Sequence, residues 1–220
     1  LSEKNLELVN EKGIDIIKGT ITVQTSEDNF ATFSIYNSSK TKAGKDNKTF
    51  AGTTTIMNDF KSIAEFGKDE ADKVVIRKGQ FNPSSYIEEA GDIKEGLHYR
   101  TNFVNRLKAG EEYAPKAEFS VEVYIASMTS EIENDIETGR LIVRGLMPTY
   151  NGIEYLTLVV PKGEIANDIQ SYYQLGMTGE FFGDLVNRKV ETVKEIPLLG
   201  GKTKREVSYT YKNELVVTGA

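Results

Sequence analysis

The alternation of apolar and polar residues in short segments is the feature that most constrains how this chain can fold. In residues 30–39, FATFSIYNSS, Phe33 and Ile35 fall on one side of an extended backbone, and Ser34 and Tyr36 fall on the other. Successive side chains of a strand point to opposite faces, so this pattern is typical of a strand with one buried face. Segments of this kind recur between turn-forming residues, which predicts a mainly β protein.

The expected elements occur twice in the same order, which is three strands, a helix and two strands. In the first half they cover residues 14–23, 30–39, 49–57, 59–73, 74–81 and 97–107. In the second half they cover residues 117–132, 138–150, 152–161, 163–176, 177–193 and 204–219, with a hairpin turn at Asn151-Gly152. Residues 1–12 have helix-forming composition and predict a short helix that ends at Gly13.

This order of elements matches the oligonucleotide/oligosaccharide-binding (OB) fold, a five-stranded, partly open barrel. We therefore expect a mainly β chain with two tandem OB-fold five-stranded barrels, each with a helix between strands 3 and 4. The expected boundaries are an N-terminal extension at 1–12, a first OB-fold domain at 13–108, a linker at 109–116 and a second OB-fold domain at 117–220. An unrelated α+β meander is the structural alternative.

Composition and charge exclude several classes of protein. The chain has no Cys, which excludes disulfides and thiolate zinc sites and fits a reducing cytoplasm. No apolar run is long enough to span a bilayer as a helix. The net charge of −6 argues against a simple polycation, yet its distribution is uneven. Residues 13–108 carry 14 Lys/Arg and 13 Asp/Glu, whereas residues 117–220 carry 10 and 15, so the first half is nearly neutral and the second is acidic.

Cations and aromatic residues lie side by side in the first half, as in residues 73–89, KVVIRKGQFNPSSYIEE. Single-stranded nucleic acid offers phosphates to cations and flat bases to aromatic rings. The loop KTKAGKDNK at 40–48 adds four lysines that could neutralise phosphates, with a solvated loop tip as the plain alternative. In the second half, Arg140 and Arg144 share a strand face, and they could equally balance the acidic residues of that half.

The segments also resemble a known family. The run GTITV, FATFSIYNSS, basic loop, helix, VVIRKGQF and YRTNFVNRL over residues 13–107 is similar to single-stranded DNA-binding proteins of the bacterial and phage type. In this resemblance Gly19 lies in the first strand, and Lys78-Gly79 forms the turn into the fourth strand. The family often stacks bases on Trp; this chain has none, so Tyr and Phe would take that role. The second half matches only in the order of its elements, and two tandem domains are more typical of phage or replication-type proteins.

The sequence predicts no catalytic centre. His98 is the only histidine, no GxSxG surrounds a serine, and neither DEAD at 69–72 nor ENDIE at 133–137 has the spacing of a nucleotide or calcium site. We therefore expect a protein that is not an enzyme and has no metal or other cofactor. A small hydrolase built on His98 or on clustered carboxylates is the least favoured hypothesis.

The expected function is non-enzymatic binding of single-stranded DNA with little sequence preference, in the replication or recombination of DNA, plausibly that of a phage. The alternative is an OB-fold module for protein interaction or structure, because this fold serves many functions. The expected partners are single-stranded DNA and replication or recombination proteins, and no membrane is expected. A homo-oligomer is an option. The expected location is the cytoplasm, that of the bacterial host if a phage encodes the protein. The residues expected to contact nucleic acid are Tyr36, Lys40, Lys42, Lys45, Lys48, Arg77, Lys78, Phe81, Tyr86, Tyr99, Arg100, Arg106, Arg140, Arg144 and Tyr150.

Overall fold

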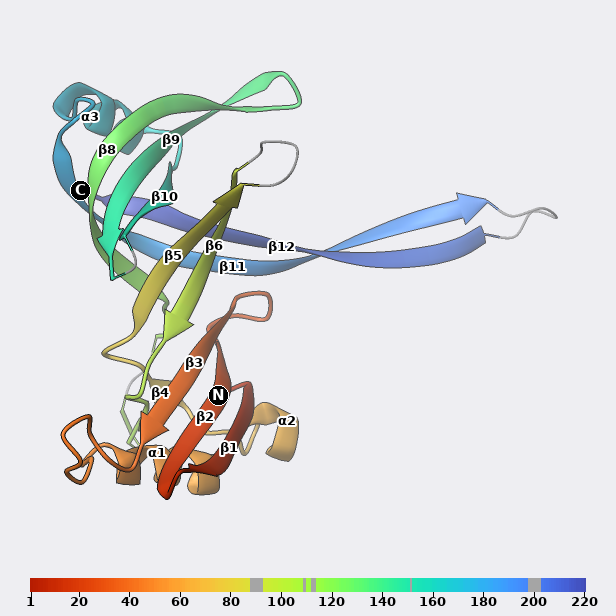
Figure 1. Cartoon of the computed structure of the whole chain (residues 1–220). Helices are drawn as coiled ribbons and strands as arrows, with labels where there is room; N and C mark the ends of the chain where they lie inside the picture. Colours follow the sequence, from red (N-terminus) through yellow and green to blue (C-terminus); the bar gives the residue numbers. More distant parts are fainter. Residues whose placement is uncertain (88–92, 109, 112–113, 151, 198–202) are drawn as a thin grey trace. The chain divides into compact units, whose positions relative to one another are not determined.

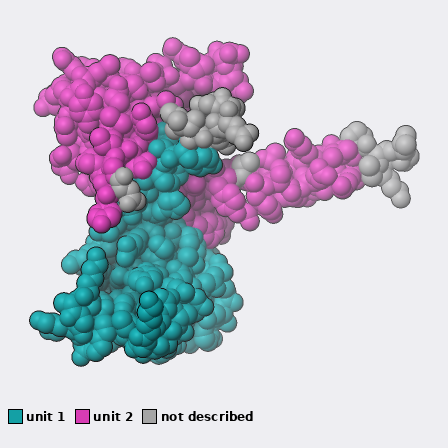
Figure 2. Space-filling view, viewed as in Figure 1, with its two compact units in different colours: residues 1–24, 31–114 teal, residues 25–30, 115–220 magenta. Residues whose placement is uncertain are grey.

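The structure is a computed structural model, and it divides the chain into two compact units (Figure 2). Unit 1 comprises Leu1–Gln24 and Ala31–Ala114, and unit 2 comprises Thr25–Phe30 and Pro115–Ala220. The described residues are 1–87, 93–108, 110–111, 114–150, 152–197 and 203–220, so three residues of the expected linker and Asn151 of the expected hairpin turn lie outside them. Most described residues are in strands, which confirms a mainly β protein.

Unit 1 is built around a five-stranded sheet with the strand order β1-β2-β3-β6-β5 (Figure 1). Its elements are β1 (Glu3–Glu11), β2 (Ile14–Gln24), β3 (Phe30–Ser38), α1 (Phe50–Asp59), α2 (Ile63–Phe66), β4 (Val74–Val75), β5 (Gln80–Ile87), β6 (Ile93–Arg100) and β7 (Asn105–Arg106). The strands β4 and β7 form a separate two-stranded sheet. The fully buried Ile17, Ile21 and Ile35 form the centre of the core, with Ile56 of α1 beside them.

The prediction of a helix over residues 1–12 is wrong, because this segment is strand β1. It pairs antiparallel with β2 from Glu3↔Thr22 to Glu11↔Ile14. Lys12 and Gly13 both have positive φ, 52° and 80°, which is the geometry of a two-residue hairpin turn. Gly13 therefore ends a strand and not a helix, and pairing with β2 overrides the helix-forming composition of the segment.

The predictions for residues 49–73 are also wrong in detail, because the helix α1 lies where a strand was expected. Its threonines are β-branched, which favours strands, but their hydroxyls bond back to the preceding turn. Thr54 Oγ1 donates to the carbonyl of Phe50 at 3.0 Å, and Thr53 Oγ1 accepts a hydrogen bond from Asn37 Nδ2 at 2.6 Å. Of the helix expected at 59–73, only the single turn α2 forms.

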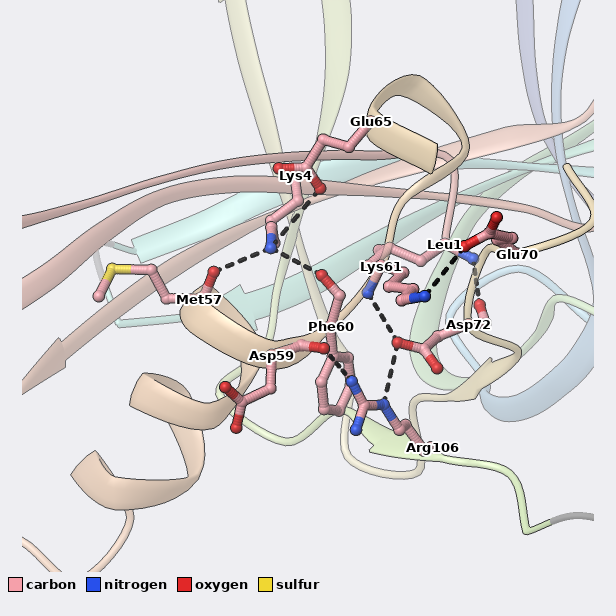
Figure 3. Close-up of polar contacts among 10 residues, drawn as sticks. All are labelled: Leu1, Lys4, Met57, Asp59, Phe60, Lys61, Glu65, Glu70, Asp72 and Arg106. Atoms are coloured by element: carbon pink, nitrogen blue, oxygen red, sulfur yellow. Dashed lines mark hydrogen bonds and ion pairs between the residues drawn. The ribbon is translucent and has the colours of Figure 1, made fainter. Parts of the chain in front are cut away.

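A lysine from β1 completes the C-terminal end of α1 (Figure 3). The last turn of α1 has no basic residue of its own. Lys4, whose side chain is buried, donates from Nζ to the carbonyls of Met57 at 2.8 Å and Phe60 at 2.7 Å, and lies 3.6 Å from the Glu65 carboxylate. A cation at this end of a helix satisfies unpaired carbonyls and the negative end of the helix dipole, which anchors α1 to the sheet.

Unit 2 is a closed five-stranded barrel with the strand order β10-β12-β11-β8-β9. Its elements are β8 (Glu118–Glu133), β9 (Ile136–Thr149), β10 (Gly152–Val160), α3 (Glu164–Tyr172), β11 (Thr178–Pro197) and β12 (Thr203–Gly219). The strands β10 and β12 run parallel, and the other neighbouring pairs run antiparallel. A closed barrel of five strands is consistent with the OB fold.

The helix α3 lies between β10 and β11 in the chain, and it buries Ala166 and Ile169. The barrel interior is filled by alternate residues of each strand, among them Val123, Val143 and Phe181, all essentially inaccessible to solvent. None of the helices in the described ranges has the length and apolarity needed to cross a membrane.

The strands β11 and β12 continue as a two-stranded ribbon well past the rest of the barrel (Figure 1). The pairing of β11 with β8 ends at Asp184↔Glu118, whereas the pairing of β11 with β12 extends to Pro197↔Thr203. The register of β11 against β12 shifts between Phe182 and Gly183, close to where the barrel ends. A Cβ at Gly183 would lie 2.0 Å from the carbonyl oxygen of Val216, so only glycine allows the two backbones to approach here.

Replacing Gly183 with alanine should therefore lower the stability of unit 2. We expect Gly183→Ala to reduce the free energy of unfolding by about 2 kcal/mol or more, since either the backbone or the register must move. Urea denaturation followed by circular dichroism measures this loss. The matched control is Gly52→Ala in α1, where a Cβ meets nothing within 4 Å and should be neutral or stabilising by up to about 1 kcal/mol. Equal stability of Gly183→Ala and the parent chain would contradict the close approach.

Candidate nucleic-acid interface

The exposed face of β3, β6 and β5 in unit 1 brings together two distant parts of the sequence, the strand β3 and the consecutive strands β5 and β6. Ser34 of β3 is the parallel partner of Arg100 of β6, and Arg100 is the antiparallel partner of Gln80 of β5. Tyr36 follows two residues after Ser34 on the same face of its strand. We call this surface the β3–β6–β5 face; its members are Thr32, Ser34, Tyr36, Gln80, Asn82, Ser84, Tyr86, Gly96, His98 and Arg100.

The β3–β6–β5 face combines exposed rings with cations. Tyr36 is 49% exposed and Tyr86 is 63% exposed, and both Arg100 and His98 are exposed between them. None of the described residues that form this face is an Asp or a Glu, in a chain that contains 33 of them. Within these three strands the face offers flat rings and positive charge without a carboxylate. The same side of the sheet continues across Thr22 of β2, which bonds Thr32, to Glu3 of β1.

A side chain extends the backbone pairing that holds Tyr36 in place. The backbone pairing of β3 with β6 ends when Thr101 N–H donates to the carbonyl of Ser34 at 3.1 Å. Beyond it, Asn102 Nδ2 donates to the carbonyl of Tyr36 at 3.0 Å, and Asn102 Oδ1 accepts from the Tyr36 N–H at 3.3 Å. The amide of Asn102 thereby acts as one more peptide group of the ladder. Satisfying both backbone groups of Tyr36 fixes the position of its exposed ring.

Lys78 lies next to a further exposed ring, that of Phe103. The Nζ atom of Lys78 is 5.4 Å from the centroid of the Phe103 ring, within the range of a cation–π interaction. Thr101 Oγ1 donates to the carbonyl of Lys78 at 3.2 Å and accepts from the Phe103 N–H at 3.0 Å, which ties the two segments together. Arg77 is exposed beside Lys78. The expected site residues Arg77 and Lys78 are therefore close to the strand ends that carry Arg100.

Two of the expected aromatic residues belong to the inner side of this sheet. Tyr99 is 9% exposed, and its ring centroid is 5.6 Å from that of the buried Phe33. Phe81 is the Cα partner of Tyr99 and is half-buried. Tyr99 therefore contributes to the core, and Phe81 lies beside it on the same side of the sheet.

The lysine-rich loop at 40–48 is exposed, and its lysines are not equivalent. Lys40 pairs with Asp46 of the same loop at 2.6 Å, and this hydrogen bond and its charge lower the pKa of the Asp46 carboxyl. Lys42, Lys45 and Lys48 are exposed, and within the described chain no carboxylate forms an ion pair with them. Three lysines of this loop are thus available to an anion, and they belong to the loop after β3 and not to the β3–β6–β5 face.

Arg106 has a structural role in unit 1 (Figure 3). Its Nε atom is 2.9 Å from the Asp72 carboxylate, a terminal nitrogen donates to the carbonyl of Asp59, and its guanidinium lies 4.4 Å from the centroid of the Phe60 ring. Asp72 in turn accepts from the backbone N–H of Lys61 at 2.7 Å. Arg106 joins β7 to the helix region, and its charge is already matched.

The three expected residues of unit 2 are in three different environments. Arg140 is half-buried and forms ion pairs with Glu131 at 3.4 Å and Glu214 at 2.6 Å, so it is part of the barrel. Arg144 is exposed on β9. Tyr150 is fully exposed at the turn between β9 and β10.

Arg144 lies beside a row of exposed residues that crosses the barrel. Leu146, two residues further along β9, is the Cα partner of Tyr124 on β8 and of Tyr155 on β10. Both tyrosines are exposed. We call these residues, with Arg144, the Tyr124 row. It is a second surface on which rings and a cation share one face.

Several residues of these surfaces were not among those that the sequence predicted to contact nucleic acid. Tyr124 alternates with the buried Val123 and Ile125, and the same period-two pattern that identified Tyr36 could have found it. His98 shares its strand face with Arg100, two residues away. Phe103 and Asn102 lie after the end of β6, where no periodicity indicates the direction of a side chain.

The described residues contain no group of three or more His, Cys, Asp or Glu side chains that could hold a metal ion. The side chains on the two surfaces are rings, cations and neutral polar groups, with Leu146 between the two tyrosines of the Tyr124 row. Groups of this kind are suited to an anionic or aromatic ligand.

The strand connectivity and these surfaces define a mainly β protein with a closed five-stranded barrel consistent with the OB fold. The chain belongs to the YorF family, whose model matches residues 1–220. Among solved structures it is similar to a deletion mutant of the single-stranded DNA binding protein from Thermus aquaticus, with 8% identity and a TM-score of 0.46. That match covers 97% of this chain and 86% of the other. No curated protein matches the sequence.

The two classes of tyrosine should respond differently to truncation. We expect Tyr99→Ala to lower the free energy of unfolding of unit 1 by about 3 kcal/mol, because it leaves a cavity beside Phe33. Tyr36→Ala should change that free energy by less than about 0.5 kcal/mol, because the ring is largely solvated and Asn102 bonds only its backbone. Urea titrations of both variants measure the difference. If both variants lost a similar free energy of unfolding, Tyr36 would be a core residue and not part of an exposed face.

Proposed function

We propose that this protein binds single-stranded DNA with little sequence preference and without catalysis, chiefly through the β3–β6–β5 face. The observation that carries this proposal is the absence of carboxylates from the described residues of a face with two exposed tyrosines, an arginine and a histidine. The whole chain has a net charge of −6, so a cationic ligand would be attracted to its acidic surfaces and not to this face.

The chemistry of such a face suits a polyanion with flat bases. Every base has a π-face, so stacking on Tyr36 and Tyr86 would stabilise binding by about 1–3 kcal/mol per base whatever the sequence. Arg100, Lys78 and Arg77 would neutralise phosphates and release condensed counterions. Duplex DNA hides its base faces, so it could use the cations but not the rings.

The proposal includes a tandem arrangement of two OB-fold domains. The sheet of unit 1 has the order β1-β2-β3-β6-β5, with β3 and β6 parallel, and the barrel of unit 2 has its third and fifth strands, β10 and β12, parallel as well. In each unit a helix follows the third strand. On this reading the Tyr124 row is a second contact for the same kind of ligand. The biological setting we propose is the protection of single strands in the replication or recombination of phage DNA, in the bacterial cytoplasm.

A role as a protein-interaction module is the second candidate. It is favoured by exposed apolar side chains of unit 2, for example Ile132, Ile136 and Ile153 near the ends of its hairpins. Under this alternative the tyrosines of unit 1 would be dispensable for binding any oligonucleotide.

Fluorescence anisotropy with labelled oligo-dT tests the proposal. We expect binding that weakens steeply with salt, and a loss of affinity of roughly fivefold to 150-fold for Tyr36→Ala or Tyr86→Ala, since one stacking contact disappears. Arg100→Ala should weaken binding and lower the slope of log affinity against log salt by roughly 0.7, the value for one phosphate contact on a single strand.

Two control variants distinguish the loss of a single DNA contact from a general loss of oligo-dT binding. Tyr86→Phe keeps the ring and should bind as the parent chain does, and Lys68→Ala removes an exposed charge of unit 1 outside the face and should leave the salt slope unchanged. Absence of oligo-dT binding at low salt, or equal binding by the parent and Tyr36→Ala chains, would reject the proposal.

A further inference from the structure

The β11–β12 ribbon of unit 2, residues 186–197 and 203–214, has no partner strand along most of its length. At its base it is bordered by residues 25–30, where Asp28 accepts from the backbone N–H of Lys189 at 3.2 Å. Beyond Lys189 no other strand of the described chain pairs with either edge. An isolated two-stranded hairpin is at best marginally stable in water, so the outer ribbon needs further contacts to be well formed.

One face of the ribbon carries two tyrosines and two valines on neighbouring pairs. Along this face, from the barrel outward, the cross-strand pairs are Lys189↔Tyr211, Glu191↔Tyr209, Val193↔Val207 and Glu195↔Arg205. We call these eight residues the Tyr209 face. Tyr209 is 50% exposed and Tyr211 is 70% exposed, and the two valines between the charged ends are exposed as well.

The opposite face of the ribbon is better suited to water. There Lys204 pairs with Glu206 at 2.9 Å, and Ser208 Oγ donates to the carbonyl of Thr192 at 3.3 Å. Its exposed apolar residues, Val190 and Ile196, are separated by polar positions. The Tyr209 face is therefore the one on which contact with another surface would remove most apolar area from water.

The charges of the Tyr209 face argue against a polyanion as its partner. Lys189 and Arg205 are balanced by Glu191 and Glu195, so the face is formally neutral. The Nζ atom of Lys189 already lies 3.9 Å from the centroid of the Tyr209 ring. This differs from the β3–β6–β5 face, where the described members include no carboxylate.

The residues of the Tyr209 face are arranged so that two copies of the face can complement each other. A two-fold axis parallel to the strands would place β11 of one copy over β12 of the other and keep each pair at its own level. Lys189 would then face the partner's Tyr211, Val193 the partner's Val207, and Glu195 the partner's Arg205. Each cation would meet a ring or a carboxylate, and the valines would meet at the centre.

We propose that two copies of this chain associate face to face through their Tyr209 faces, with the ribbons parallel. An interface of this kind is isologous, since the same residues contribute from both copies. Two tyrosines and two valines from each copy form a small apolar centre compared with the roughly 800 Å² per partner of a standard interface. We therefore expect a reversible equilibrium between monomer and dimer. This inference is independent of DNA binding, because the association needs no ligand.

Charge reversal on the full chain, followed by sedimentation equilibrium without DNA, tests the proposed dimer. In Glu195→Arg the two copies would place arginines opposite each other, and in Arg205→Glu they would place glutamates opposite each other. We expect each variant alone to dimerise at least about tenfold more weakly than the parent chain, since two symmetric attractions become repulsions. An equimolar mixture of the two variants should form heterodimers with an affinity close to that of the parent, because the charges are again opposite between copies.

The mixture distinguishes an interface from a folding defect. Residues 195 and 205 of each variant still carry like charges in the mixture, so a folding defect would persist there, whereas an interface would be restored. The matched control is Lys194→Glu, which creates the same repulsion with Glu206 on the other face and should leave dimerisation unchanged. A parent chain that stays monomeric at its highest soluble concentration would overturn the proposal, as would a mixture that stays monomeric or a control that dissociates equally. Loss of oligo-dT binding in the ribbon variants, with a monomeric parent chain, would assign the face to nucleic acid instead.

Discussion

The short parallel contact between β3 and β6 is the interaction on which the candidate interface of unit 1 depends. Only Phe33↔Tyr99 and Ser34↔Arg100 pair through their backbones, and the Asn102 amide then carries the ladder on to Tyr36. The contact between the Phe33 and Tyr99 rings supports the junction from the core side. Without this junction, the exposed ring of β3 and the cation of β6 would have no fixed relation to each other.

The charges of the protein are distributed unevenly, so a net acidic chain has two surfaces of different electrostatic character. The β3–β6–β5 face leaves its arginine and histidine without carboxylates among the described neighbours on that face, which suits phosphates. The Tyr209 face balances two cations with two glutamates around a valine pair, which suits a copy of itself. Net charge alone would have predicted neither, because ligands respond to the local arrangement of charges at the short distances over which salt allows them to act.

Period-two alternation was the most reliable guide from sequence to structure. It placed Tyr36 on an exposed face, and the turn-and-helix signals placed the β9–β10 hairpin and α3. It failed where tertiary contacts decided the outcome: β1 forms because β2 is available to pair, and α1 is held as a helix by the burial of Ile56 and by Lys4 of β1, which bonds the carbonyls at its C-terminal end. Alternation also could not tell which face of β6 is buried, so Tyr99 was expected at the site and lies in the core. Lys40 forms an ion pair with Asp46, which is close in sequence, and Arg106 forms one with Asp72, which is distant. The spacing of charged residues in the sequence predicts neither ion pair.

Binding of single-stranded DNA to the β3–β6–β5 face is tested most directly by finding where oligo-dT contacts the protein. Ultraviolet crosslinking of oligo-dT to the full chain, followed by mass spectrometry of the peptides, identifies the rings that stack on bases. We predict crosslinks at Tyr36 and Tyr86 that disappear in excess salt. Crosslinks confined to Tyr209 and Tyr211, or none at either tyrosine of the β3–β6–β5 face, would contradict this prediction.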